Sequence, residues 1–156
     1  MSITIGEKAP EFNLHDTEKK IVTLAGLRGN NILLLFFPLA FTGVCTKELC
    51  SVRDNIAAYN NVNAKVFGIS VDSPQTLARF KEEQHLNFTL LSDFNKEASE
   101  SFGCLYSSFA GWMKGVSKRS AFIINKEGIV QYAEVLENAG ELPDFEKINA
   151  TLASLN

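Results

Sequence analysis

Histidine is scarce in this chain of 156 residues, which contains only His15 and His85. The two are isolated, so no His–Asp–Cys or His–Asp–Ser arrangement can be placed beside a nucleophile. The chain has three cysteines, of which Cys45 and Cys50 lack a second ligand pair at the spacing of a zinc site. We therefore expect no metal site.

Excess positive charge and long apolar runs are also absent. The net charge is −3 and the pI is about 5.4, whereas nucleic-acid binders carry a basic face, so we expect no nucleic-acid partner. The longest apolar run, Ile32 to Phe41, is too short to span a bilayer and contains Pro38, which excludes a membrane span. Residues 1–8 lack the features of a secretory signal, so the expected location is the cytoplasm.

The pattern along the chain predicts one α/β domain over residues 1–156. We find no internal repeat, low-complexity segment or linker. Short apolar segments of strand-like period alternate with helix-like segments, which favours parallel strands, and a turn at 125–128 predicts a final hairpin. Strands are expected at 21–24, 32–37, 64–71, 89–91, 120–125 and 129–134, and helices at 44–60, 74–85, 96–102 and 144–155.

The ten residues from Phe36 to Cys45 are the most informative stretch. An apolar strand runs into Pro38, Thr42 follows four residues later, and Cys45 follows three residues after that, at the start of a predicted helix. A helix N-terminus favours a thiolate over a thiol. Its contribution is at most about 2 kcal/mol, whereas a thiol mostly ionised at neutral pH needs about 3 kcal/mol. A nearby cation and further hydrogen bonds are therefore required.

Arg119 is the candidate for this cation. It begins the predicted strand at 120–125, and a guanidinium offers a fork of donors suited to a thiolate and to a peroxide oxygen. The alternative is a surface arginine at the edge of a strand. Glu48, three residues after Cys45, is a secondary candidate, and its alternative is an acid placed favourably near the start of a helix.

The Pro38, Thr42 and Cys45 pattern resembles the peroxidatic motif of the peroxiredoxins. The resemblance covers nearly the whole chain and implies a thioredoxin-like fold, with a central mixed sheet flanked by helices. Glu48-Leu49, Leu91 to Phe94 and the strand after Arg119 are similar to the AhpE branch. In that branch a glutamate at the place of Glu48 helps to position the arginine or to manage protons. The position of Cys50 is instead similar to the bacterioferritin-comigratory-protein branch, and the two branches stay open.

The resemblance implies a thiol-dependent peroxidase that reduces hydrogen peroxide and organic hydroperoxides without metal, haem, flavin or other cofactor. The Cys45 thiolate would attack one peroxide oxygen and become a sulfenic acid. The Thr42 hydroxyl, the Arg119 guanidinium and the Val44 and Cys45 amides would hold both oxygens. Pro38 would shape the loop and shield the thiolate, although it could also simply end the strand.

Cys50 is the candidate resolving cysteine. It lies about 140° around the helix from Cys45, which predicts that it faces solvent, where a cysteine is unusual for packing. Five residues of intact helix separate the two Cα atoms by about 8–9 Å, more than the limit of about 7 Å for a disulfide, so the helix would have to unwind. The alternatives are that Cys50 is a bystander, or that Cys104 resolves. Cys104 reads otherwise as a small buried hydrophobe.

The expected partners are a peroxide and a thioredoxin- or glutaredoxin-like reductant, and the resemblance also implies a homodimer. Two rival functions stay open. A thioredoxin-type disulfide reductase needs a Cys-X-X-Cys pair, whereas four residues separate Cys45 from Cys50. A redox sensor or chaperone that relays oxidation to a partner protein would share the first chemical step.

Overall fold

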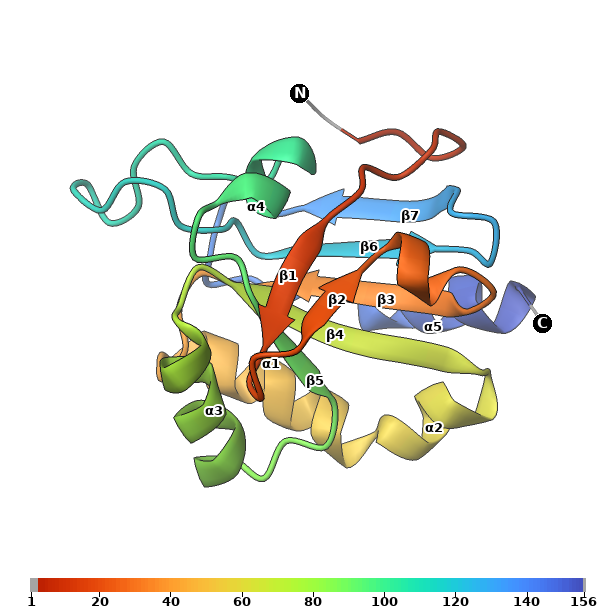
Figure 1. Cartoon of the computed structure of the whole chain (residues 1–156), viewed down its shortest axis with the longest axis horizontal. Coiled ribbons are helices and arrows are strands. Elements are labelled where there is room, and N and C mark those ends of the chain that lie inside the picture. Colours follow the sequence, from red (N-terminus) through yellow and green to blue (C-terminus); the bar gives the residue numbers. More distant parts are fainter. Residues whose placement is uncertain (1–2, 156) are drawn as a thin grey trace.

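β3 (Asn31–Phe36) is the centre of the fold, because all six of its residues are buried. The computed structural model, which describes residues 3–155, places it between β4 (Ala64–Ser70) and β6 (Ser120–Ile124) in a seven-stranded sheet of order β2-β1-β5-β4-β3-β6-β7 (Figure 1). A strand covered on both faces needs a continuous apolar run, and Ile32 to Phe36 supplies it.

The sheet is mixed, and its connections are those of an α/β protein. β3, β4 and β5 are parallel, whereas β6 runs antiparallel to β3 and forms a hairpin with β7. The predicted α/β class and late hairpin are therefore confirmed. The remaining elements are β1 (Asn13–Asp16), β2 (Ile21–Thr23), a 3₁₀ turn (Ala25–Leu27), α1 (Gly43–Asp54), α2 (Ile56–Asn61), α3 (Pro74–Glu83), β5 (Thr89–Ser92), α4 (Glu97–Ser101), β7 (Val130–Val135) and α5 (Phe145–Ser154).

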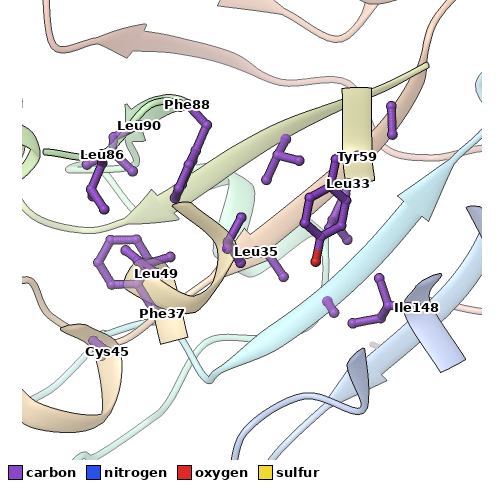
Figure 2. Packing of buried hydrophobic residues seen from close by; sticks show 14 of the residues in the cluster. Leu33, Leu35, Phe37, Cys45, Leu49, Tyr59, Leu86, Phe88, Leu90 and Ile148 are labelled. Carbon is purple, nitrogen blue, oxygen red and sulfur yellow. The ribbon is translucent and has the colours of Figure 1, made fainter. Parts of the chain in front are cut away.

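Alternation along β3 divides the apolar core between the two faces of the sheet. Leu33 and Leu35 pack with side chains of α1, α2, α3 and α5, and Figure 2 shows them beside Leu49 and Tyr59. The even-numbered β3 residues pack on the opposite face with α4 and the N-terminal segment. The face covered by α1 is the one that carries Cys45. Within residues 3–155, no helix combines the length and apolar character needed to cross a bilayer.

Two elements differ from the prediction. The expected helix at 44–60 is interrupted at Asn55, whose side-chain amide donates to the carbonyl of Ser51 and which separates α1 from α2. Such local bonding by asparagine competes with the helical backbone pattern. β1 is not predicted from the sequence, because only Leu14 of its four residues is buried and the strand carries little apolar signal.

The loop between β3 and α1, residues 37–42, is held in place from the neighbouring strand ends. Asp72 Oδ2 accepts hydrogen bonds from the Ala40 amide at 2.8 Å and from Ser70 Oγ at 2.6 Å. Phe41 has a left-handed backbone, with φ of 66°, and its ring packs on Phe80 of α3 at 5.1 Å between centroids. These contacts fix the loop that precedes Cys45.

Candidate active site

Cys45 is the third residue of α1 and is almost completely buried, with 1% of its surface exposed. Thr42 is the N-cap residue, with an extended backbone that sets the direction of the helix. The first N–H groups of a helix have no partners within that helix, so the amides of Val44 and Cys45 belong to the positively polarised end. The structure thus places the thiol where negative charge is favoured.

Arg119 reaches Cys45 because β6 runs antiparallel to β3, so that its first residues lie beside the end of β3. Arg119 Nη2 donates to Cys45 Sγ at 3.1 Å. Nη2 and Nε also donate to the carbonyl of Ala139, at 3.1 and 3.3 Å. The side chain is buried, so the alternative of a surface arginine is wrong. Burial opposes its charge, but Glu48 and Cys45 outweigh that effect and raise the pKa of Arg119.

Glu48 forms a buried ion pair with Arg119 on the side of the guanidinium away from Cys45's hydrogen bond, through Nη1 rather than Nη2. Its Oε1 accepts from Arg119 Nη1 at 2.6 Å, and both side chains are buried. The alternative of an acid that only favours the helix start is therefore wrong, because Glu48 faces the core. Burial raises the pKa of Glu48 to about 7, against the opposing effect of Arg119. Among the described residues, no group hydrogen-bonds to Glu48 Oε2.

The Glu48 carboxyl should make the stability of the protein depend on pH. Its pKa is about 7 when folded and 4.5 in the reference state, so between these values the unfolded chain binds fewer protons than the folded one. Stability should then fall as the pH rises from 4.5 to 7, by about 3 kcal/mol at 1.4 kcal/mol per pKa unit, and level off above. Urea unfolding of the reduced protein across this range, compared with Glu48→Gln, should show a slope that the variant loses. If the free energy of unfolding changed with pH in the same way in the wild type and in Glu48→Gln, Glu48 would not be the group responsible.

A cavity of about 260 Å³ opens onto the cysteine. Thr42 lies at its rim, and its Oγ donates to the carbonyl of Leu39 at 2.8 Å, which leaves the hydroxyl oxygen able to accept a hydrogen bond. A hollow of about 410 Å³ near His15 contains no cysteine, lysine or arginine. The cavity at Cys45 is lined by Pro38, Thr42, Gly43, Val44, Cys45, Phe109, Arg119, Ala139 and Gly140.

Three residues that line or support the site carry no clear sign of this role in the sequence. Ala139 acts through its backbone carbonyl, and a backbone group leaves no side-chain signal in a sequence. Phe109 lines the cavity from a loop that the sequence shows only as aromatic. Asp72 accepts a hydrogen bond from the Ala40 amide just after the end of β4. In the sequence, its position between a predicted strand and Ser73-Pro74 indicates only that it follows a strand.

The other two cysteines lie apart from this cluster. Cys50 is half-buried against the core and its thiol donates to Gln84 Oε1 at 3.5 Å, so the expectation that it faces solvent is wrong. The reason is that the end of α3, at Gln84, covers the side of α1 that carries Cys50. The periodicity of α1 alone does not predict this contact with another helix. Cys104 is fully buried, and burial raises the pKa of its thiol to about 12. All three thiols are free.

Comparison with known proteins identifies the family to which this site belongs. Residues 5–133 match the AhpC/TSA family. The chain is 35% identical to alkyl hydroperoxide reductase E of Mycobacterium tuberculosis over 156 residues, covering 98% of each. It is 38% identical to peroxiredoxin Bcp of Escherichia coli over 128 residues, covering 81% of this chain and 82% of the relative. The crystal structure of peroxidoxin BcpB from M. tuberculosis superposes with a TM-score of 0.86 at 29% identity, covering 99% of both chains. The thioredoxin-like fold is thus confirmed, and the chain belongs to the AhpC/TSA family, the peroxiredoxins.

Proposed function

We propose that this peroxiredoxin reduces hydrogen peroxide and organic hydroperoxides with Cys45 as its peroxidatic residue. The observation that carries the proposal is the hydrogen bond of 3.1 Å from Arg119 to Cys45 Sγ inside a cavity lined by both residues. A fixed guanidinium beside a buried sulfur favours the thiolate, which is the nucleophilic form of cysteine. The family supplies the reaction class, thiol-dependent reduction of peroxide by an external thiol reductant.

The arrangement supports direct displacement at the peroxide. The Cys45 thiolate attacks one oxygen, a sulfur–oxygen bond forms, and the oxygen–oxygen bond breaks, so that sulfur is oxidised and the leaving oxygen departs with the electron pair. Arg119 and the first amides of α1 stabilise the charge that develops on the leaving hydroxide or alkoxide. The Thr42 oxygen, whose own proton is bonded to Leu39, accepts from a protonated peroxide oxygen. Pro38 contributes no N–H to the cavity wall and keeps water from the sulfur.

We further propose that Cys50 resolves the sulfenic acid through a Cys45–Cys50 disulfide, which a thioredoxin- or glutaredoxin-like protein then reduces. Both cysteines belong to the intact helix α1, so the disulfide requires its first turns to unwind. Cys104 is the weaker alternative, because its burial keeps it in the thiol form and away from the cavity. Thioredoxin-like partners fit this scheme because they attack disulfides with a thiolate.

One experiment tests both cysteine assignments. The reduced protein would receive one equivalent of peroxide, its free thiols would be blocked, and its peptides would be weighed by mass spectrometry. We expect a Cys45–Cys50 disulfide in the wild type, and a sulfenic acid at Cys45 in Cys50→Ser. Cys104→Ala is the matched control and should still form the disulfide. A free Cys50 in the oxidised wild type would mean that an external thiol resolves Cys45, and an unmodified Cys45 would overturn the peroxidase proposal.

We also propose that the enzyme acts as a cytoplasmic homodimer. The segment from Tyr106 to Met113 supports this assembly, because Trp112 is 75% exposed while its neighbour Phe109 lines the cavity. A large exposed aromatic beside a reactive site is a common feature of an interface between protein chains. The alternative of a redox sensor or chaperone is not favoured, because the relatives of this chain are peroxiredoxins.

A further inference from the structure

The two halves of α1 are held by different parts of the protein. At the C-terminal half, Cys50 donates from Sγ to Gln84 Oε1 at 3.5 Å, and Arg53 Nη1 donates to the carbonyl of the same Gln84 at 2.5 Å. Asn87 Nδ2 donates to the carbonyl of Arg53 at 3.1 Å. Gln84 is the residue at which α3 ends, so this half of α1 is fastened to the turn after α3.

The N-terminal half of α1 is held to the rest of the protein by Arg119. Its buried polar contacts beyond the helix run from Cys45 and Glu48 to Arg119. A thiolate attracts the guanidinium, whereas a sulfenic acid carries no net charge, so oxidation weakens the Cys45 contact. Gln84 keeps its contacts with Cys50 and Arg53 through this step. Oxidation therefore weakens one of the two contacts that Arg119 makes with the first turns, while the C-terminal half stays anchored to Gln84.

We propose that Gln84 is a positioning residue that holds the Cys50 thiol turned away from Cys45 and thereby sets the lifetime of the sulfenic acid. This inference rests on the proposed resolution of Cys45 by Cys50. The side chain of Gln84 contacts Cys50 and not Cys45, so it acts on the resolving step through Cys50. While the thiol donates to Gln84 Oε1, its proton is held toward α3, and the sulfur cannot turn toward Cys45 without breaking this hydrogen bond. Release from Gln84 is then a step that precedes attack on Cys45.

The covalent step balances without a further reactant. Cys50 sulfur attacks Cys45 sulfur, a sulfur–sulfur bond forms, and the sulfur–oxygen bond of the sulfenic acid breaks. The hydroxyl leaves with the proton of the Cys50 thiol as one water molecule. Cys50 sulfur is oxidised as Cys45 sulfur is reduced, so the pair keeps the two oxidising equivalents taken from the peroxide. A longer-lived sulfenic acid has more time to meet a second peroxide and become a sulfinic acid.

The test removes the acceptor and keeps the shape of the side chain. Gln84→Met retains the backbone carbonyl that Arg53 binds, Gln84→Glu retains an acceptor oxygen, and Gln75→Ala on the exposed first turn of α3 is the matched control. Stopped-flow fluorescence of Trp112, the single tryptophan, would follow oxidation and then disulfide formation. Mass spectrometry after a peroxide titration would measure the ratio of sulfinic acid to disulfide.

We expect Gln84→Met to form the disulfide about threefold faster, the effect of one weak hydrogen bond. The peroxide concentration that gives half sulfinic acid should rise by the same factor. The rate of the first oxidation should not change, and Gln84→Glu and Gln75→Ala should behave like the wild type. A wild type that forms the disulfide no more slowly than Gln84→Met would overturn the role of Gln84 and leave the resolving cysteine intact. A wild type that forms no disulfide would overturn both, and a slower first oxidation in Gln84→Met would show general loosening instead.

Discussion

Replacing Cys45 with serine is expected to lower the rate of peroxide reduction by a factor of about 10⁴ or more. A serine hydroxyl is not ionised at neutral pH, and its oxygen has neither the nucleophilicity nor the accessible oxidation states of sulfur. Cys45 is buried, and serine has nearly the same shape and keeps an oxygen that can accept from Arg119, so the change alters little of the packing. The loss of activity should therefore greatly exceed the loss of stability. Peroxide consumption with a thiol reductant in excess measures the rate.

The control for this variant is another cysteine outside the cavity. Cys104 lies in the core on the opposite face of the sheet from Cys45, so Cys104→Ala should keep the rate of peroxide reduction. Unfolding in urea would confirm that Cys45→Ser remains folded. If Cys45→Ser still consumed peroxide at the wild-type rate, another residue would be the nucleophile and the proposed function would fail.

Replacing Arg119 with methionine is expected to produce the second largest effect. The change removes the donor at 3.1 Å from the sulfur, and loss of one such fixed donor lowers a rate by about 10²–10³. It also breaks a buried ion pair, which lowers the free energy of unfolding by about 3–5 kcal/mol. Stopped-flow measurement of the Cys45 oxidation rate gives the first effect, and urea unfolding gives the second.

A double variant separates the chemical effect from the structural one. Arg119→Met leaves Glu48 buried without its partner, whereas Arg119→Met with Glu48→Gln contains neither charge. The double variant should regain part of the lost stability, because Glu48 without Arg119 must either bury a charge or take up a proton, whereas the glutamine amide does neither. Its oxidation rate should stay low, because no cation faces the sulfur. Recovery of the rate together with stability would show that Arg119 acts only as a support.

The direction of the Arg119 side chain is a feature of the site that the sequence pattern predicts. A strand alternates its side chains between two faces, and Arg119 shares its parity with Ala121 and Ile123, which pack on the face covered by α1. With β6 placed beside β3, Arg119 must point toward the start of α1. The apolar run of β3 and the start of a helix close to Cys45 likewise follow from local sequence. These features depend on the strand period and on helix ends.

Other features of the site depend on contacts between distant segments. The burial of Glu48 follows from its pairing with Arg119, 71 residues away, and no local pattern predicts an acid in the core. The half-burial of Cys50 depends on where α3 ends, at Gln84. Ala139 contributes a carbonyl, which every residue possesses, so its part is visible only when the chain is folded. Local sequence patterns therefore indicate the proposed nucleophile, Cys45, more readily than the residues that support it.

The antiparallel pairing of β6 with β3 also determines where this chain can change its length. Phe36 pairs with Ser120, so the residue before the pair is the one that meets Cys45. Deleting a single residue inside β6 would turn Arg119 to the opposite face of the sheet and carry its charge into the apolar layer beneath α4. An extra residue in the hairpin turn at 125–128, beyond the paired stretch, would leave that register untouched. We therefore expect the turn to accept an inserted residue or an engineered tag without moving Arg119 away from Cys45. An insertion within β6, which is five residues long, would displace Arg119.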